Sequence, residues 1–200
     1  MKADEIKHFY IFRHGECPLN QTGHIQGQKF NGQLTELGCK QAEHIGIILK
    51  DKEIEIIVTS PMKRAIQTAL IAKKHLEPIP ILVDHRLIEV NMGVVEGMHI
   101  SLAEKKYAET YKHWRSGRLN DLLTHFEQGE SKAQVRKRVF AALEYYAQNT
   151  KYKNIAISTH GIAIAQILQY FGIKKTNIPN GAVLFINYNK PIWSYEGFVE

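Results

Sequence analysis

Four short apolar runs limit the folds that are open to this chain. None of them alternates apolar with polar side chains, so each is expected to be a strand buried on both faces, as in a parallel sheet. The runs are residues 8–12, 55–60, 79–83 and 154–158. Because parallel strands need long crossover connections, usually helices, the pattern predicts an α/β fold. We expect a three-layer α/β/α sandwich with a mainly parallel central sheet.

Helical patterns fill the stretches between the expected strands. Apolar positions follow one side of residues 35–50. In the next helix, Ser60 is a suitable N-cap and Pro61 a suitable first residue. A capping-box pattern, in which Glu or Gln follows Ser after three residues, predicts the start of two further helices. These two starts are at 101–104 and 131–134, and a last helix is expected at 161–171.

The end of the chain and its length bear on domain organisation. Residues 182–188 and 191–198 are two strand-like runs separated by a short turn, which is typical of a hairpin. A length of 200 residues predicts one domain, 1–200. Within this domain, residues at about 101–130 are interpreted as a helical insertion or cap.

Charge and cysteine content narrow the partners and the compartment. A net charge of +6 suits a small acidic substrate and is too modest to indicate nucleic-acid binding. The N-terminal stretch 1–12 carries acids where a secretory leader would be apolar. The sequence has no apolar run long enough to predict a membrane span. Cys17 and Cys39 fit a reduced cytoplasm and are not spaced as a metal-binding pair. The oligomeric state stays open between monomer and homodimer.

Ionisable side chains follow each of the four expected parallel strands. The first strand ends in Arg13 and His14, and the fourth is followed by His160. Arg64 lies in the helix after the second strand, and Glu89 lies after the third. Since ligands of such sheets bind beyond the carboxyl ends of the strands, we expect these five side chains to converge.

This set of side chains suits phosphoryl transfer. Two guanidinium groups can hold a phosphoryl group through paired hydrogen bonds. One imidazole can attack phosphorus, and a second can donate to the phosphoryl oxygens. A carboxyl group can protonate the leaving oxygen and then deprotonate water. Gly15 and Gly161 allow the backbone to approach the group closely, and the sequence contains no cluster of metal ligands.

Five motifs in this sequence resemble those of the histidine phosphatase superfamily, which also contains the cofactor-dependent phosphoglycerate mutases. They cover most of the chain and occur in the family's order. The motifs are RHGE (13–16) with Asn20 and Gly27, LTELG (34–38), SPMKRAIQT (60–68), Glu89 with GVVEG (93–97), and STHG (158–161). The resemblance implies a phosphoglycerate mutase-like fold with a helical insertion over the site.

The same resemblance implies a role for each matching residue. His14 is expected to be the phosphorylated nucleophile, reachable from the surface, and Glu89 the proton donor that later acts as base. Arg13, Arg64 and His160 are expected to form the phosphate pocket. Residues that would line the pocket or meet the substrate are Asn20, Gln26, Gly27 and Gly161. Neither a metal nor a cofactor is implied.

Three departures from the family pattern favour a phosphatase over a mutase. Cys17 stands where the family often has Thr or Ser, whose hydroxyl is a stronger donor. Val90 and Met92 stand where mutases usually have Arg and Tyr, and the chain is shorter than typical mutases. The expected function is hydrolysis of phosphomonoesters, with a small anionic metabolite as substrate. The alternatives are a mutase-type phosphotransferase, a phosphoprotein phosphatase and a non-catalytic phosphate binder.

Several residues outside these motifs have both a structural and a functional interpretation. Asn180 is expected in the turn before the last hairpin, although the family often has an Asn near the site there. Cys17 is expected to be an unreactive thiol, with a redox role as the alternative. The remaining histidines are expected in surface or structural positions: His8, His24, His44, His75, His85, His99, His113 and His125.

The cations of the insertion and of the helix after it are open to two interpretations as well. The insertion's basic segment is either a solvated helix face or a cap that selects anionic substrates. Its members are Lys105, Lys106, Lys112, His113, Arg115 and Arg118. On the following helix, Lys132, Arg136, Lys137 and Arg138 are expected to be mostly solvated, with Arg138 able to pair with a buried acid.

Overall fold

A six-stranded sheet forms the centre of the protein in a computed structural model that describes residues 6–116 and 118–200. The strand order is β3-β2-β4-β1-β5-β6. The first four of these strands run parallel, and β5 is antiparallel to both β1 and β6. The strands are β1 (Lys7–Arg13), β2 (Ile56–Thr59), β3 (Ile81–Val83), β4 (Asn154–Thr159), β5 (Val183–Asn189) and β6 (Ile192–Val199). The prediction of a mainly parallel sheet that ends in a hairpin is confirmed.

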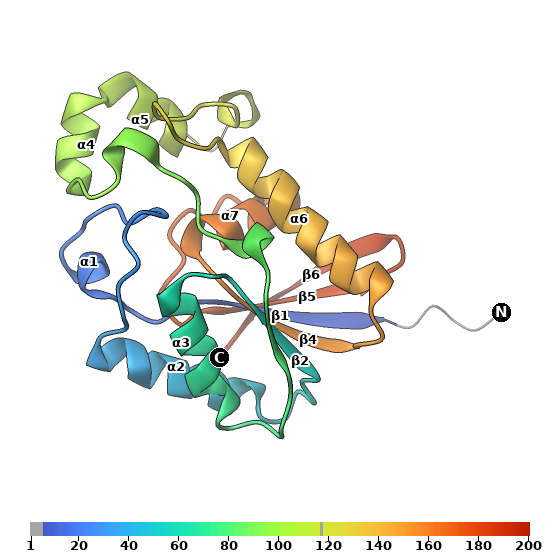
Figure 1. The fold of residues 1–200 in the computed structure, drawn as a ribbon. Coiled ribbons are helices and arrows are strands. Elements are labelled where there is room, and N and C mark those ends of the chain that lie inside the picture. The colour runs from blue at the N-terminus through green and yellow to red at the C-terminus, as the bar shows by residue number, and fades with distance from the viewer. Residues whose placement is uncertain (1–5, 117) are drawn as a thin grey trace.

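Helices cover both faces of this sheet, as the strand pattern predicts. Figure 1 shows α2 and α3 on one face and α6 and α7 on the other. The α-helices are α1 (Pro18–Gln21), α2 (Glu36–Leu49), α3 (Lys63–Lys73), α4 (Ile100–Lys106), α5 (Ala108–Arg115), α6 (Lys132–Asn149) and α7 (Gly161–Tyr170). Short 3₁₀ turns lie between them: η1 (His85–Leu87), η2 (Gly93–Val95) and η3 (Leu119–Asp121). No helix in the described ranges is both long and apolar enough to span a membrane. Residues 1–5, which include the acids Asp4 and Glu5, lie outside the described residues.

The continuous apolar runs are explained by burial on two sides. In β1, Phe9 and Ile11 belong to the core beneath α6 and α7, while Tyr10 and Phe12 belong to the core beneath α2 and α3. The same division holds for β2 and β4. Because successive side chains of a strand point to opposite faces, both sets of positions must be apolar.

Two helices begin at residues other than the sequence predicts. Helix α3 starts at Lys63, whose backbone N–H donates to Asn31 Oδ1 at 2.6 Å, and Ser60 lies outside the helix. Helix α4 is capped by the imidazole of His99, which accepts from the Ser101 backbone N–H. Both predictions from the capping patterns were therefore wrong, because the caps come from side chains that the local pattern does not identify.

The start of α6 is as predicted. Ser131 Oγ accepts from the Gln134 backbone N–H at 3.3 Å, and the Gln134 side chain accepts from the Ser131 N–H at 2.8 Å. These two bonds form the capping box that the SKAQ pattern predicts.

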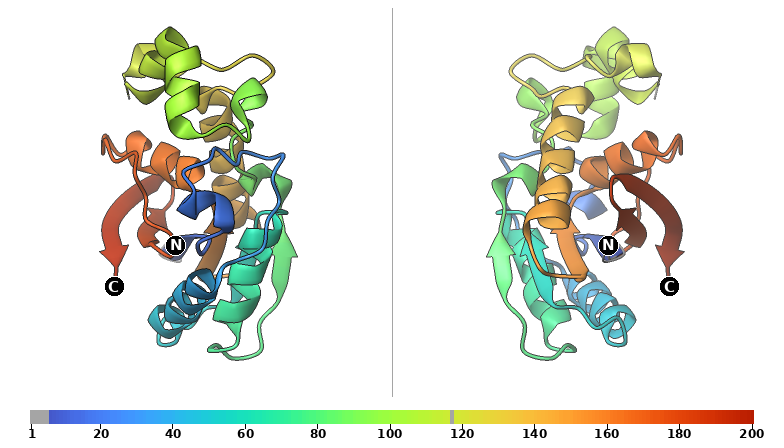
Figure 2. Two further views of the ribbon diagram at one scale, coloured as in Figure 1. Left: turned by 90° about the vertical axis from the view of Figure 1, so that its left-hand side faces the viewer. Right: turned by 90° about the vertical axis from the view of Figure 1, so that its right-hand side faces the viewer.

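Residues 100–116 and 118–121, with α4, α5 and η3, form the cap. Figure 2 shows the cap at one end of the molecule, above the loop that carries α1. Trp114 of α5 packs on Phe126 with a ring-centroid distance of 5.8 Å, and both are part of the core beneath α6 and α7. The predicted helical insertion is thus present and is fixed to the body by aromatic packing.

Candidate active site

The carboxyl ends of β1, β2 and β4 place the candidate residues side by side. Arg13 is in register with Thr159, and the His14 backbone N–H donates to the Thr159 carbonyl at 3.0 Å. The next residue of each strand is therefore a histidine, His14 or His160. Their ring centroids lie 5.2 Å apart. The strand register thus brings together two residues that are far apart in the sequence.

The hydrogen bonds of His14 define the form of its imidazole. Nδ1 lies 2.7 Å from the Gly15 carbonyl oxygen, which only accepts, so Nδ1 carries the proton. Nε2 accepts from Arg64 Nε at 3.2 Å. His14 is 2% exposed, so the expectation of a surface-accessible side chain was wrong. Burial, and then the charges of Arg64 and Arg13, hold the pKa of His14 well below its ordinary value.

Arg64 is buried and holds a loop as well as His14. Its Nη1 donates to the Phe30 carbonyl at 2.9 Å and its Nη2 to the Gly27 carbonyl at 3.0 Å. The planar fork that the sequence assigns to phosphate is thus engaged by the backbone of this loop, while Nε points at the imidazole. Burial lowers the pKa of Arg64, and the nearby charge of Glu89 opposes this shift.

Arg13 is the last residue of β1 and directly precedes His14. Its Nη1 donates to the Ile178 carbonyl, and its buried Nε has no hydrogen-bond partner among the described residues. A Cβ on Gly161 would lie 3.4 Å from this Nε, so a glycine there keeps the approach to Arg13 open. The guanidinium therefore retains a donor that a phosphoryl oxygen can accept.

His160 is fully buried at the start of α7. Its Nε2 lies 2.7 Å from Ser60 Oγ, and its Nδ1 has no partner in the described parts of the chain. Burial and the charges of Arg64, His14 and Arg13 lower its pKa well below the ordinary value. Ser60 positions this imidazole. The sequence pattern gave no sign of this role, because Ser60 followed by Pro61 predicts a helix cap.

Glu89 lies in the loop between η1 and η2, with its carboxylate close to both arginines. Oε1 accepts from the Val90 backbone N–H at 2.9 Å, and Oε2 accepts from the Ile162 N–H at 3.4 Å. The Glu89 carbonyl accepts from Arg138 Nη2 at 3.1 Å. Arg138 pairs with Glu130 at 2.7 Å, in a partly buried position that fits its predicted acid partner. Arg138 therefore fixes the backbone that carries Glu89.

Among the residues expected to meet the substrate, Gly27 and Asn20 are connected to these side chains by hydrogen bonds, Gly27 to Arg64 and Asn20 through Asn180. Asn20 Oδ1 accepts from the Cys17 backbone N–H at 3.0 Å and from Asn180 Nδ2 at 3.5 Å. Gly27 has φ +53°, and its carbonyl holds Arg64. Gln26 is buried, and its Oε1 has no partner among the residues described.

Asn180 is closer to the chemistry than its turn position suggests. Its Nδ2 donates to the His14 carbonyl at 2.9 Å and so links the last loop to the first strand end. The sequence signal available for it was the family's frequent Asn at that place. Asn180 is therefore a positioning residue, although the sequence pattern predicts only a turn there.

The structure gives the burial of Cys17 and of the cations for which the sequence allows two interpretations. Cys17 is buried, and burial raises its pKa to about 11, which keeps the reactive thiolate scarce at neutral pH. All six cations of the basic segment are exposed, and Arg115 among them lines a cavity beside α7. Lys132, in contrast, is 5% exposed, so the prediction of a solvated side chain was wrong. The described residues contain no group of three or more His, Cys, Asp or Glu placed to hold a metal ion.

Comparisons with known proteins identify the family of this chain. The sequence profile of the histidine phosphatase superfamily (branch 1) matches residues 9–197. A relative from Escherichia coli (strain K12 / DH10B), called probable phosphoglycerate mutase GpmB, is 30% identical over 95% of this chain and 89% of its own length.

Two solved structures share the fold. Phosphoglycerate mutase from Bacillus anthracis has a TM-score of 0.86 at 21% identity, over 98% of this chain and 93% of that one. Mycobacterial glucosyl-3-phosphoglycerate phosphatase has a TM-score of 0.82 at 22% identity, over 96% of this chain and 98% of that one. Because the profile matches nearly the whole length of the chain and the Escherichia coli relative is 30% identical to it, this chain belongs to the histidine phosphatase superfamily, branch 1.

Proposed function

We propose that the protein hydrolyses phosphomonoesters through a phosphohistidine intermediate on Nε2 of His14. The observation that carries this proposal is the pair of hydrogen bonds of His14, from Nδ1 to the Gly15 carbonyl and from Arg64 to Nε2. They leave the lone pair of a neutral imidazole directed at Arg64. The lowered pKa keeps this imidazole unprotonated at neutral pH, as a nucleophile requires.

The remaining groups supply charge stabilisation. As Nε2 forms a bond to phosphorus, the bond from phosphorus to the alcohol oxygen breaks. Arg64 Nε turns from the imidazole to a phosphoryl oxygen, and the free Nε of Arg13 donates to another. The Ser60 hydroxyl accepts from the Met62 N–H and lies 2.7 Å from His160 Nε2. In the proposed mechanism this hydroxyl donates to Nε2, and the proton on His160 Nδ1 is a third donor to the phosphoryl group.

Glu89 moves the protons in both steps. As a carboxylic acid it gives its proton to the departing alcohol oxygen. As a carboxylate it then takes a proton from water, which attacks phosphorus while the bond to Nε2 breaks and phosphate forms. Its hydrogen bonds from the Val90 and Ile162 backbone amides hold the carboxyl group at the edge of the site.

Two buried side chains support hydrolysis over transfer to a second hydroxyl. Val90 and Met92, which stand where mutases carry Arg and Tyr, are part of the apolar core and present no polar group to a bound product. The free thiols of Cys17 and Cys39 support a cytoplasmic location.

Mutase activity is the second candidate, because a relative 30% identical to this chain is called a probable phosphoglycerate mutase. The two activities differ in the acceptor of the phosphoryl group. Release of free phosphate from a panel of phosphorylated metabolites, set against transfer to monophosphoglycerate, separates them. Free phosphate as the main product supports the phosphatase.

The nucleophile is tested by trapping the intermediate. Wild-type protein mixed with labelled substrate and quenched in base should carry acid-labile phosphate, and His14→Ala should carry none and show no turnover. His44→Ala, at an exposed histidine of α2, is the matched control and should label like the wild type. Equal labelling of His14→Ala and the control would exclude His14 as the nucleophile.

A further inference from the structure

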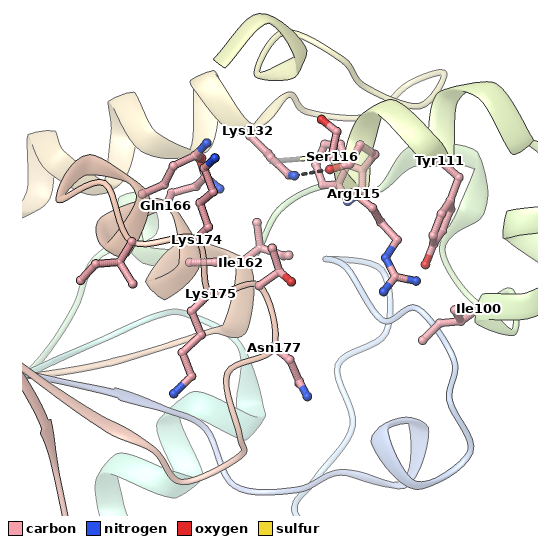
Figure 3. A pocket seen from close by; sticks show the side chains of 15 residues that line it. Ile100, Tyr111, Arg115, Ser116, Lys132, Ile162, Gln166, Lys174, Lys175 and Asn177 are labelled. Carbon is pink, nitrogen blue, oxygen red and sulfur yellow. Dashed lines mark hydrogen bonds between the residues drawn. The ribbon is translucent and has the colours of Figure 1, made fainter. Parts of the chain in front are cut away.

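A cavity of about 580 Å³ lies between the cap and α7. Its walls come from α5, the first turn of α6, one side of α7 and the loop 173–177 (Figure 3). Ile162 lines it and directly follows Gly161, and the Ile162 N–H donates to Glu89 Oε2. The cavity therefore adjoins the carboxyl group that we assign to protonation of the leaving alcohol. Its volume suits a metabolite-sized group.

The cavity is cationic. Its lining includes Arg115, Lys132, Lys174 and Lys175 and contains no Asp or Glu. Arg115 has a partner, since its Nη1 lies 2.8 Å from Glu104 Oε1 in the neighbouring α4. The three lysines have no salt bridge to a carboxylate within the described ranges. The cavity therefore carries a surplus of positive charge.

Lys132 is the most unusual of these cations. It is the first residue of α6 and is 5% exposed. Its Nζ donates to the Trp114 carbonyl, a contact drawn in Figure 3, and lies 5.1 Å from the centroid of the Trp114 ring. A buried ammonium group normally has an anionic partner, because removing a charge from water is costly. Burial lowers the pKa of Lys132 and the charge of Asp121 opposes this shift, but no salt bridge joins these two described residues. The Asp121 oxygens are instead bonded to His113 and Ser116, so Lys132 remains suited to an anion from outside the chain.

The rest of the lining is largely apolar. Ile100 and Tyr111 belong to the cap side, and Ile162 and Ile173 to the side of α7. Trp114 closes the end at which Lys132 lies. A bound group would therefore have an apolar middle between the phosphoryl group and the ammonium of Lys132.

We propose that this cavity binds the leaving-group part of the substrate and that Lys132 pairs with an anionic group at its far end. This inference rests on the proposed phosphatase function. It defines the substrate class as phosphomonoesters of an alcohol with an apolar body that ends in a carboxylate or a second phosphate. Lys132, together with the cap, is then a residue that determines specificity.

The test uses two series of esters with matched chain lengths, n-alkyl phosphates and alkyl phosphates that end in a carboxylate. A third series, with a phosphate at each end, distinguishes the two kinds of anion. At the best chain length, wild-type protein should prefer an anion-terminated ester to the plain ester in kcat/KM. The expected preference is about ten- to a hundredfold, the contribution of one hydrogen bond to a charged group.

Lys132→Met removes the ammonium and keeps the stem, and it should bring this preference close to one. Lys137→Met is the matched control on the same helix, because Lys137 is exposed and is not part of the cavity wall. It should leave the preference as in the wild type. Lys174→Glu reverses a charge on the exposed rim and should lower the preference even if Lys132→Met does not fold.

The outcomes separate this inference from the proposed function. Hydrolysis of both series without a preference, or a preference that survives Lys132→Met and Lys174→Glu, overturns the anion site and leaves the phosphatase standing. Failure to hydrolyse any ester overturns the phosphatase. In that case, calorimetric binding of the same compounds to the wild type and to Lys132→Met decides the anion site by itself.

Discussion

At the scale of single residues, the site combines two uncharged imidazoles with the buried guanidinium group of Arg64 and the partly buried one of Arg13. Arg13 and Arg64 are among the groups that lower the pKa of His14 and of His160, after burial itself. The same arginines that would hold a phosphoryl group therefore also keep the proposed nucleophile free of its proton. This dual effect follows from position, since histidine alone has an ordinary pKa near neutrality.

The lowered pKa values predict a loss of stability in mild acid. Below the ordinary histidine pKa of 6.5, the unfolded chain binds protons at His14 and His160 that the folded protein does not. The stability that the two neutral histidines contribute to the folded protein is complete above this pH. It is lost as the pH falls toward their pKa values in the folded protein. Each histidine should lower the free energy of unfolding by up to about 1.4 kcal/mol for each pH unit below 6.5. Urea unfolding across this range measures the slope, and His14→Gln/His160→Gln should flatten it. An unchanged slope in that double variant would contradict the assignment.

Glu89→Gln should slow the hydrolysis of alkyl phosphates far more than that of nitrophenyl phosphate. An alkoxide needs a proton as it departs and a nitrophenolate barely does, so the alkyl rate should fall about 10²–10⁴-fold. Because Glu89 is also proposed to activate water, nitrophenyl phosphate should give a burst and then a slow steady state. Rapid-quench kinetics measures both phases.

Glu96→Gln is the control for this experiment. The Glu96 carboxylate accepts from the backbone N–H groups of Gln28, Lys29 and Met92 and so joins two loops. Replacement of Glu96 should change the rates of hydrolysis of alkyl phosphates and nitrophenyl phosphate by the same factor. If Glu96→Gln shows the dependence on leaving group and Glu89→Gln does not, the acid is Glu96.

At the scale of elements, the helix starts depend on which side chain reaches the free backbone amides. In α6 the cap is local, since Ser131 and Gln134 satisfy each other's backbone. In α4 the cap is His99, and in α3 it is assisted by Asn31 from a distant loop. The same kind of serine pattern therefore marks a helix start at one position and fails to mark it at another.

Ser131→Ala should lower the free energy of unfolding by about 1 kcal/mol, the usual contribution of an N-cap side chain. Ser101→Ala is the matched control, because its backbone N–H keeps the bond to His99 when the hydroxyl is lost. Urea unfolding of both variants gives the comparison. A larger loss in Ser101→Ala would indicate that Ser101, and not His99, is the effective cap of α4.

At the scale of the whole molecule, close backbone contacts hold the site together. A Cβ on Gly15 would lie 2.2 Å from the Gly38 carbonyl oxygen, and a Cβ on Gly38 would lie 2.2 Å from the Glu16 carbonyl oxygen. The loop after β1 therefore lies directly on the start of α2, and only glycines allow this approach. This contact fixes the backbone on which His14 sits.

Gly15→Ala should reduce both activity and stability. Its methyl group would meet backbone, which cannot rotate away, and overpacking of this kind costs about 1–3 kcal/mol. Gly32→Ala is the control, because nothing lies within 4 Å of the Cβ it would add. Thermal unfolding and phosphate release measure both effects. Wild-type activity in Gly15→Ala would show that the loop can move without disturbing His14.

The sequence by itself determined the layered α/β fold and the places where chemistry could lie. Strands buried on two faces must be apolar throughout, so 8–12 and 154–158 could be recognised without any tertiary information. Residues such as Arg13 and His14 then stand out because two ionisable side chains stand where a buried strand ends. Convergence at one edge follows from the parallel order of the strands, so the grouping of His14 with His160 was predictable as well.

Only the tertiary structure decided which neighbours each side chain has. Ser60 holds His160, and Asn180 holds the His14 carbonyl, across 100 and 166 positions of the chain. Lys132 is buried because the cap folds over it, while Lys137, on the same helix, stays exposed. Sequence patterns report the neighbours of a residue along its own helix or strand. Burial, pKa and hydrogen-bond partners instead depend on groups that other segments bring close, and these are fixed only when the chain packs.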